Sequence, residues 1–299
     1  MNMTTLENKI DFAVILRVTK ANPNGDPLNG NRPRMDYDGY GEISDVCIKR
    51  KIRDRLSEMK DGQGKYMHSV LIQCDERKVD DATSIKNRIE AVLKSELNGG
   101  KKEEFAKAAC AHWFDVRAFG QVFAFSSDKK KGKKAEEGET DPVGDTGISV
   151  AVRGPVTVHS AFSMEPIRPE SIQITKSVNN EDTKDGKKSA DTMGMKHRVD
   201  KGVYVFFGSI NPQLAEKTGF SNGDAQTIKS ILPKMFENDE SSARPAGSME
   251  VVKVVWWDHK CKAGNYSSAK VHGSLQVNSD GSYSLAKLNN LVAEEIPGF

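Results

Sequence analysis

Cations crowd one segment of the chain and give it the chemistry to bind an anion. At about 100° per residue, the apolar residues Ile48, Ile52 and Leu56 fall on one stripe of a helix. Cations flank this stripe, with Lys49 and Arg53 on one side and Lys51 and Arg55 on the other. The segment therefore predicts a helix that packs through its apolar stripe and offers positive charge to an anionic partner.

The start of this helix is marked by its own residues. Ser44 is a good N-cap, and Asp45 suits the positive end of the helix dipole. Asp45 and Asp54 offset the cations only in part, which favours a polyanion as the partner. The alternative is a solvated amphipathic helix that binds nothing, and charge density alone leaves both open.

A second segment combines apolar side chains with cations. Within the polar stretch 176–201, Met193 and Met195 alternate as residues on one face of a hairpin do. The cations that follow them are Lys196, His197, Arg198 and Lys201. An apolar wedge beside cations is suited to entering a stacked nucleic acid strand. The alternative is a surface loop whose methionines fold back onto the protein.

Carboxylates near the N-terminus raise the question of metal-dependent catalysis. They are Asp26, Asp36, Asp38 and Glu42. Mg²⁺ needs only one or two protein carboxylates, so composition leaves this chemistry open. Asp26 also fits a turn, because an Asn-Gly-Asp-Pro sequence satisfies local backbone groups. His112 and Cys110 lack the second pair of a zinc site, and no motif of nucleophilic catalysis is present.

Composition is that of a globular protein. The 299 residues are 37% hydrophobic and carry a net charge of +2. Four separated cysteines without a C-x-x-C pair are typical of reduced thiols in the cytosol. No secretory signal, membrane-spanning run or phosphate-binding loop motif is found. We therefore expect a cytoplasmic protein without a cofactor or a membrane partner.

Strands and helices are expected to interleave. Residues 11–19 predict the first strand, and a loop rich in Asn, Gly and Pro leads from it to the cationic helix. Helices are expected at 82–97, 103–125 and 225–236. Further strands are expected at 148–161, 171–178, 202–210 and 249–257. The Lys- and Glu-rich stretch 128–147 predicts a mobile loop.

This succession predicts an α+β fold with helices on one face of a sheet, as in ferredoxin-like units. Most aromatic residues of the stretch 112–120 are expected in the core. Tyr204, Phe206 and Phe207 are expected in the core or in a subunit interface, because their placement does not match an RNA-recognition consensus.

Four short motifs, in this order along the chain, resemble one family. They are Asn22-Pro-Asn-Gly-Asp-Pro27, the run from Ile43 to Asp54, Phe114-Asp-Val-Arg-Ala-Phe-Gly120 and Arg153-Gly-Pro-Val156. Together they resemble the backbone subunits of type I CRISPR effector complexes, which belong to the RAMP superfamily. The likeness is greatest to the type I-C form of Cascade and extends over essentially the whole chain.

The resemblance implies a fold and an assembly. The fold is an RNA-recognition-like, ferredoxin-like palm with finger, web and thumb insertions, which form one elaborated domain over 1–299. The insertions are expected as fingers at 60–110, a flexible loop at 126–147 and a thumb at 176–201. Many copies would polymerise as a helical oligomer along a guide RNA (crRNA), beside other Cascade subunits, and the guide would pair with target DNA in antiviral defence.

The resemblance also implies the residues that contact the guide. They are Lys49, Arg50 and Arg53, with Asn24, Arg34 and Ser44 near the same edge. Phosphate and ribose contacts are appropriate here, because the protein must hold any guide sequence and leave base edges free. A wedge formed by Met193 or Met195 would be equally tolerant of sequence.

Three further arginines are weaker candidates. Arg244 lies in a loop with Pro and Gly and is either an RNA contact or an exposed loop residue. Arg117 and Arg153 adjoin apolar segments, where a buried ion pair or a strand-end contact is an equal alternative. The expected function is non-catalytic. The alternatives are a metal-dependent guide-directed ribonuclease and a general single-stranded RNA-binding module.

Overall fold

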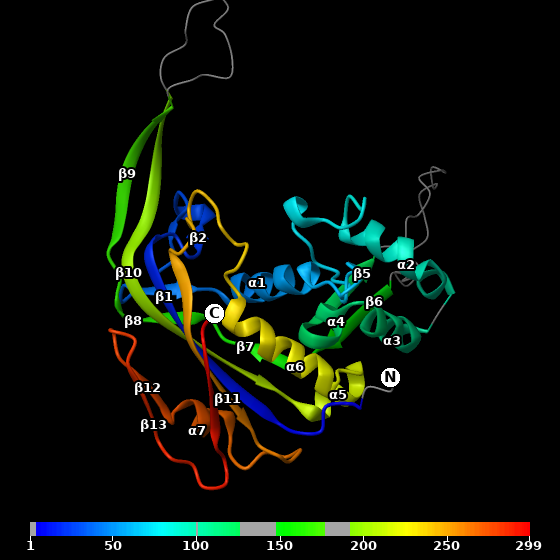
Figure 1. Ribbon diagram of the computed structural model, residues 1–299. Helices are drawn as coiled ribbons and strands as arrows, with labels where there is room; N and C mark the ends of the chain where they lie inside the picture. Colours follow the sequence, from blue (N-terminus) through cyan, green and yellow to red (C-terminus); the bar gives the residue numbers. More distant parts are fainter. Residues whose placement is uncertain (1–3, 100, 126–147, 177–191) are drawn as a thin grey trace, which may run out of the picture. The chain divides into compact units, whose positions relative to one another are not determined.

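The computed structural model describes residues 4–99, 101–125, 148–176 and 192–299 (Figure 1). The chain divides into two compact units. The larger unit comprises Asn8–Arg55, Thr157–Ile210 and Gln226–Phe299. The smaller unit comprises Met1–Glu7, Leu56–Val156 and Asn211–Ala225, and it includes the region 60–110 for which fingers are predicted.

A central antiparallel sheet with the strand order β14-β11-β1-β10-β8-β4 forms the larger unit, and β7 and β9 also pair with β10. The strands of this sheet are β1 (Ile10–Ala21), β4 (Tyr40–Ile43), β7 (Val156–Val158), β8 (Ala161–Pro166), β9 (Pro169–Lys176), β10 (Thr192–Ile210), β11 (Met249–Asp258) and β14 (Ala293–Pro297). Two small hairpins are formed by β2 (Gly25–Asp26) with β3 (Arg32–Pro33) and by β12 (Leu275–Val277) with β13 (Tyr283–Leu285). The helices are α1 (Asp45–Glu58), α6 (Asn222–Ile231) and α7 (Ser268–His272), and short 3₁₀ turns lie at Pro27–Asn29 and Leu232–Lys234.

β1 lies at the centre of the sheet and is buried on both faces, as its apolar sequence predicts. Phe12 lies opposite Gly208 of β10 and Trp256 of β11. Its ring stacks on that of Trp256 with the centroids 5.6 Å apart. A Cβ atom at position 208 would lie 2.2 Å from the Phe12 ring, so only glycine allows β10 to approach β1 this closely.

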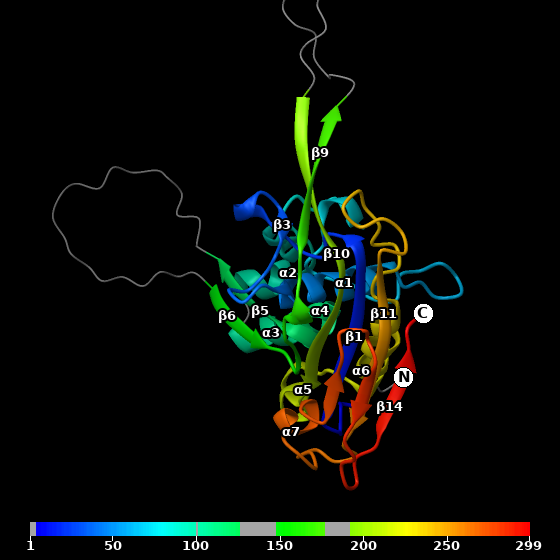
Figure 2. The same ribbon diagram turned by 90° about the vertical axis from the view of Figure 1, so that its left-hand side faces the viewer.

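Both faces of the sheet are covered. On the face that carries Trp256, Lys229 of α6 lies 5.6 Å from the centre of the indole. On the other face, Ile15 packs in a cluster with Val271 of α7 and Leu275 of β12. Figure 2 shows α7, β12 and β13 in front of the sheet. The sequence predicted a layer of helices on one face only. The second, smaller layer of α7, β12 and β13 was not predicted, because its strands are short.

The cationic helix is α1, and it forms as predicted. Ile48, Ile52 and Leu56 are fully buried. Ser44 caps the helix, because its Oγ accepts the N–H of Cys47 at 3.3 Å. The apolar stripe therefore fixes which residues of α1 face the core.

Helices and one hairpin form the smaller unit. They are α2 (Ile85–Gly99), α3 (Lys102–His112), α4 (Phe114–Phe119), α5 (Pro212–Thr218), β5 (Gly120–Phe125) and β6 (Ile148–Arg153), with a 3₁₀ turn at Asp75–Arg77. Its core gathers Trp113, Phe105, Phe123 and Ile89. The rings of Phe105 and Phe123 meet edge to face at 5.1 Å. In the stretch 112–120, Trp113 and Phe114 are core residues as predicted, whereas Phe119 is half-buried and His112 is exposed.

The prediction of one continuous helix over 103–125 is wrong. Trp113 is extended, with φ −106° and ψ 123°, and separates α3 from α4. The Asp115 carboxylate accepts the backbone N–H groups of Leu71 and Ile72, at 2.8 and 3.1 Å, which fixes the new helix start. Gly120 then adopts φ +81°, a conformation that favours glycine, and the chain continues as β5.

Other element boundaries also differ from prediction. The strand expected at 148–161 is split into β6, β7 and the start of β8, and Pro155 lies at the first break. The helix expected at 225–236 begins at Asn222 and ends at Ile231, because Pro233 lacks the N–H that would continue it. The loop expected at 128–147 lies outside the described residues.

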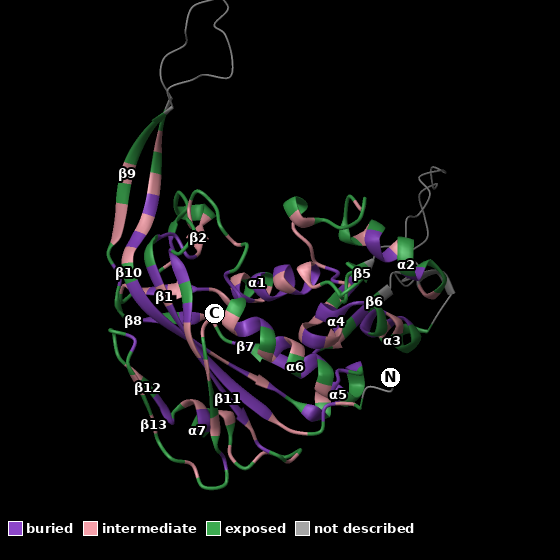
Figure 3. Cartoon of the chain, in the orientation of Figure 1, coloured by how far each residue is buried: buried purple, intermediate pink, exposed green. Residues whose placement is uncertain are grey.

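β9 and β10 form a hairpin that projects from the sheet (Figures 1 and 3). Its register pairs Met193 with Thr175 and Met195 with Gln173. Beyond this hairpin β10 enters the sheet, where it pairs with β1. Figure 3 shows the change from exposed to buried residues along the strand. The tip, 177–191, lies outside the described residues.

The four cysteines are free thiols. Cys110 is buried, and burial raises its pKa to about 11. None of the helices in the described ranges is both long and apolar enough to cross a bilayer.

Candidate nucleic-acid interface

The larger unit contains most of the residues predicted to bind RNA. They are Asn24, Arg34, Ser44, Lys49, Arg50, Arg53, Met193, Met195, Lys196, His197, Arg198 and Arg244. Arg117 and Arg153 belong to the smaller unit.

Asn24 and Ser44 position the start of α1. The Oδ1 atom of Asn24 accepts the N–H and the hydroxyl of Ser44, both at 2.9 Å. The Sγ atom of Cys47 lies 3.9 Å from the carbonyl oxygen of Pro23. The loop after β1 is thereby tied to the first turn of α1, where the helix dipole favours an anion.

The cations of α1 differ in how far their side chains are exposed to a ligand. Arg50 is the most exposed, with 59% of its side chain accessible, and its Nε lies 3.7 Å from Asp54. Lys49 is partly covered and pairs with Asp45 at 2.8 Å. Lys51 and Arg53 are buried, with 4% and 9% exposure. The expectation that the cations on both sides of the apolar stripe offer their charge to a partner is therefore wrong for Lys51 and Arg53.

Asp239 explains why Lys51 is withdrawn from solvent. Its carboxylate forms an ion pair with Lys51 and accepts the Nε–H of Arg244 at 3.0 Å. Arg55 on the same side donates to the carbonyl of Glu237 at 3.2 Å. The partner of the helix on this side is thus a segment of the protein itself.

Arg244 is half-buried rather than a solvated loop residue. Its backbone exchanges two hydrogen bonds with Ser241, at 2.9 and 3.0 Å, which closes the loop. Burial raises the pKa of Cys47, while the nearby charges of Lys51, Arg244 and Arg50 oppose the shift. Asp239 holds Lys51 and Arg244 together beside α1, and Arg50 directly precedes Lys51 in the helix.

Arg34 adds a fourth cation near this point. Its backbone N–H donates to the carbonyl of Asn24 at 3.0 Å, and its guanidinium lies 3.6 Å from Asp26. The Nε atom is buried and has no hydrogen-bond partner among the described residues. An unsatisfied buried donor of this kind favours a ligand acceptor.

The β9–β10 hairpin has two chemically different faces. Opposed residues of an antiparallel pair share a face, so Met193 and Met195 lie with Thr175 and Gln173. Both methionines are exposed, at 68% and 55%. Lys196 and Arg198 alternate with them and point to the opposite face, which also carries the exposed Ile174. The apolar wedge and the cations are thus back to back rather than side by side.

The base of the hairpin is held by polar contacts. His197 is buried, and its Nδ1 lies 2.9 Å from the hydroxyl of Ser171. The Nε–H of Arg198 donates to Glu170 at 2.9 Å. Lys20 of β1 forms ion pairs with Asp200 and, at 3.9 Å, with Glu170. His197 and Arg198 therefore serve the hairpin's own structure, whereas Lys196 is half-exposed without such a contact in the described ranges.

In the smaller unit, Arg117 is held in place. It forms a bidentate ion pair with Asp224, at 2.8 and 3.1 Å, and lies 4.6 Å from the centre of the Phe114 ring. The buried ion pair that we considered as the alternative for Arg117 is thus present. Arg153 is exposed at the end of β6.

The carboxylates of the N-terminal loop have roles in turns. Asp26 Oδ1 accepts the N–H of Leu28 at 3.2 Å, and Asp36 Oδ1 accepts those of Asp38 and Tyr40 at 3.0 and 2.8 Å. Glu42 belongs to β4. In the part of the chain that the structure describes, no three His, Cys, Asp or Glu side chains are arranged to hold a metal ion.

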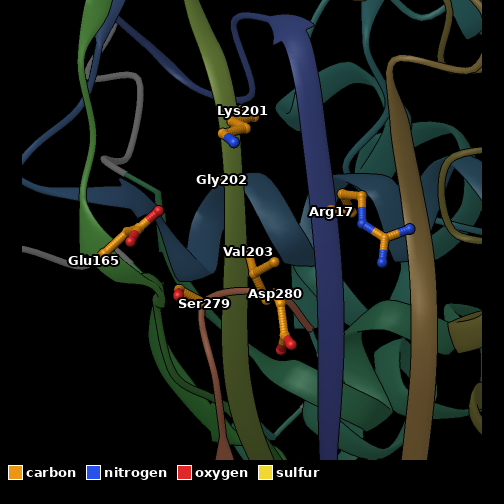
Figure 4. Close-up of a pocket in the computed structure, with 7 residues that line it drawn as sticks. All are labelled: Arg17, Glu165, Lys201, Gly202, Val203, Ser279 and Asp280. Carbon is orange, nitrogen blue, oxygen red and sulfur yellow. The ribbon is translucent and has the colours of Figure 1, made fainter. Parts of the chain in front are cut away.

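Sequence reasoning missed a charged hollow on the sheet (Figure 4). It measures about 450 Å³, and Arg17, Lys201, Glu165 and Asp280 line it. Arg17 of β1 forms an ion pair with Glu250. A Cβ atom at Gly281 would lie 3.3 Å from the Arg17 guanidinium, so the turn between β12 and β13 packs against it. The signal in the sequence was Arg17 itself, a cation within an otherwise apolar run from Phe12 to Val18.

Comparison with solved structures finds chains of CRISPR complexes. A chain of a "CRISPR RNA-guided surveillance complex, pre-nicking" is 15% identical, with a TM-score of 0.45, and covers 83% of this chain and 75% of its own. A chain of a type III-B Cmr-beta complex bound to cognate target RNA is 12% identical, with a TM-score of 0.39, over 83% of this chain and 60% of that one.

Sequence comparison is more specific. A protein of Haloferax volcanii described as CRISPR-associated protein Cas7 is 27% identical over 305 residues, which cover 98% of this chain and 82% of the relative. The family model for CRISPR-associated protein Cas7 matches residues 8–293. The chain therefore belongs to the Cas7 family of CRISPR-associated proteins.

Proposed function

We propose that this protein is the non-catalytic, crRNA-binding backbone subunit of a type I CRISPR surveillance complex. The complex is the I-C form of Cascade. Copies of the chain polymerise along the guide RNA as a helical oligomer in the cytoplasm. Other Cascade subunits complete the complex, which presents the guide for pairing with target DNA in antiviral defence. The sheet of the larger unit, with α1 on one face, serves as the ferredoxin-like palm.

The observation that carries this proposal is the β9–β10 hairpin. Two methionines are exposed on one face and cations lie on the other, on a strand pair that projects from the sheet. Apolar side chains on a projecting hairpin can insert between stacked bases without recognising the base sequence. This is the thumb of the proposed backbone subunit, and Met193 or Met195 is its wedge.

Guide phosphates are held at the first turns of α1. Arg50 is the exposed cation, and Lys49 and Arg34 lie at the same end of the helix. Asn24, Ser44 and the buried Arg53 act on the guide through the position of α1, and Arg244 contributes charge beside it. Affinity arises from phosphate contacts repeated in each protomer, and specificity arises from base pairing by the guide.

Mass measurement with and without RNA tests the proposal. We expect a large oligomer by light scattering that RNase dissociates, with end-labelled RNA intact after incubation with Mg²⁺. A protein that remains monomeric on RNA would indicate a general RNA-binding module instead. Evenly spaced cuts that Asp26→Ala abolishes would identify a ribonuclease and overturn the non-catalytic role.

A further inference from the structure

A hollow of about 600 Å³ in the smaller unit has no role in guide binding as proposed above. It is lined by residues of α3, β6 and α5, which contact one another. Ala106, Ala151 and Leu214 give it an apolar lining. A space of this size accommodates a large side chain together with parts of its neighbours.

The rim of this hollow carries three exposed cations from three elements. They are Lys107 of α3, Arg153 of β6 and Lys217 of α5. No carboxylate in the described ranges forms an ion pair with them. Glu103 and Glu216 also line the hollow. An apolar lining bordered by three cations and two carboxylates favours a protein partner that brings an apolar side chain together with one or two acidic groups.

A segment of the larger unit has the complementary chemistry. Tyr37 is fully exposed, and it stands between Asp36 and Asp38. The turn is rigid, because Asp36 accepts the N–H groups of Asp38 and Tyr40 and donates its own N–H to the Tyr40 carbonyl at 2.9 Å. Tyrosine is enriched among the residues that anchor protein interfaces, and Tyr37 stands on a fixed turn with its ring fully exposed.

We propose that Tyr37 of one copy of this chain inserts into the hollow of the next copy, with Asp36 and Asp38 facing Lys107, Arg153 and Lys217. This inference rests on the proposed assembly along RNA and names the contact that links its protomers. Because the turn and the hollow are different surfaces, the interface is heterologous and can repeat from copy to copy, as the proposed assembly along RNA requires. The rigid turn lowers the entropy lost on docking.

Cooperative RNA binding tests the contact. A short RNA that holds one protomer reports intrinsic affinity, and a long RNA reports cooperativity between neighbours. We expect Tyr37→Ala to lower the cooperativity about 30-fold, as loss of an interface anchor does, and to leave binding to the short RNA unchanged. Leu28→Ala, which removes another fully exposed apolar side chain, serves as the control and should change neither. Unchanged cooperativity in Tyr37→Ala would overturn the inference.

Mixing two defective variants provides a second test. Tyr37→Ala keeps an intact hollow, and Arg153→Glu keeps an intact turn, so a mixture should form one interface and yield dimers by sedimentation velocity. Adding Asp38→Arg to Arg153→Glu in one chain should restore longer oligomers. If Arg153→Glu instead weakens binding to the short RNA, the hollow binds nucleic acid and the inference is wrong. Failure of the wild type to bind any RNA would reject the proposed function, while self-association without RNA would still test the contact.

Discussion

Asn24 Oδ1 accepts both the N–H and the hydroxyl of Ser44, each at 2.9 Å. The Ser44 hydroxyl donates to Asn24 and accepts the Cys47 N–H, so the bond to Asn24 holds the capping oxygen in place. The cap of α1 therefore depends on a residue 20 positions earlier, in the loop after β1.

Replacing Asn24 should weaken this cap. We expect Asn24→Ala to lower the free energy of unfolding by about 1–2 kcal/mol, since two hydrogen bonds and the orientation of an N-cap are lost. Asn29→Ala is the matched control, because Asn29 is exposed in the same loop. Denaturant unfolding measures both, and equal stability of the two variants would contradict the role of Asn24.

Asp239 should be essential for the buried charge of α1. Asp239→Ala leaves Lys51 buried without its partner, which should cost about 3 kcal/mol. Adding Lys51→Met should recover most of this loss, because the stem of Met packs against Phe236 without a charge to satisfy. Unfolding of the single and double variants measures the coupling. A double variant no more stable than Asp239→Ala would show that Lys51 is not the cause.

Arg50 should make the main phosphate contact of α1. We expect Arg50→Ala to weaken RNA binding about tenfold for every sequence and to reduce the salt slope by about 0.7, the value for one phosphate on a single strand. Lys260→Ala is the control, since Lys260 is a more exposed cation of the same unit that lies outside the cluster. Titrations at several salt concentrations decide the matter, and an unchanged slope for Arg50→Ala would exclude the contact.

The methionine face of the hairpin should act on RNA bases. A Met193→Ser, Met195→Ser variant should lose the fluorescence increase of 2-aminopurine that an unstacked base gives on binding. Ile174→Ser, on the opposite face, should retain it. Loss of the signal in both variants would mean that the whole hairpin, rather than one face, displaces the base.

Asp11 should make stability depend on acid pH. Burial by itself raises its pKa, but the hydrogen bond with His259 and the charge of Lys9 outweigh this and lower the pKa from its ordinary value. A lowered pKa in the folded state means that the unfolded chain binds the proton first as pH falls. The stabilisation is therefore complete above about pH 4 and is lost below it. Unfolding between pH 7 and pH 3 should show a smaller loss in Asp11→Asn than in the wild type, from a lower starting value.

Strong local patterns in the sequence predicted much of the fold. The apolar run of β1 and the apolar stripe of α1 determined both elements, and alternation placed Met193 and Met195 on one face of a hairpin. Each of these patterns depends on residues close together in the sequence, so it can be recognised without the structure.

Contacts between distant residues could not be predicted in this way. Lys51 is removed from the binding surface by Asp239, 188 positions away, and Trp113 ends α3 because Asp115 binds the backbone at Leu71. The sequence shows Lys51 only as a cation beside other cations. Its availability depends on tertiary packing, which neither periodicity nor spacing reports.

β10 is one uninterrupted strand from the hairpin to the centre of the sheet, about 60 Å long at the usual rise per residue. Its outer half carries Met195, and its inner half carries Phe206, which is fully buried. A displacement of the outer half is therefore transmitted along the strand to the hydrogen bonds between β10 and β1, because no loop separates the two halves. Ordering of the outer half by a ligand should slow amide hydrogen exchange at the inner residues of β10. Exchange rates in the sheet should therefore respond to ligand binding at the hairpin.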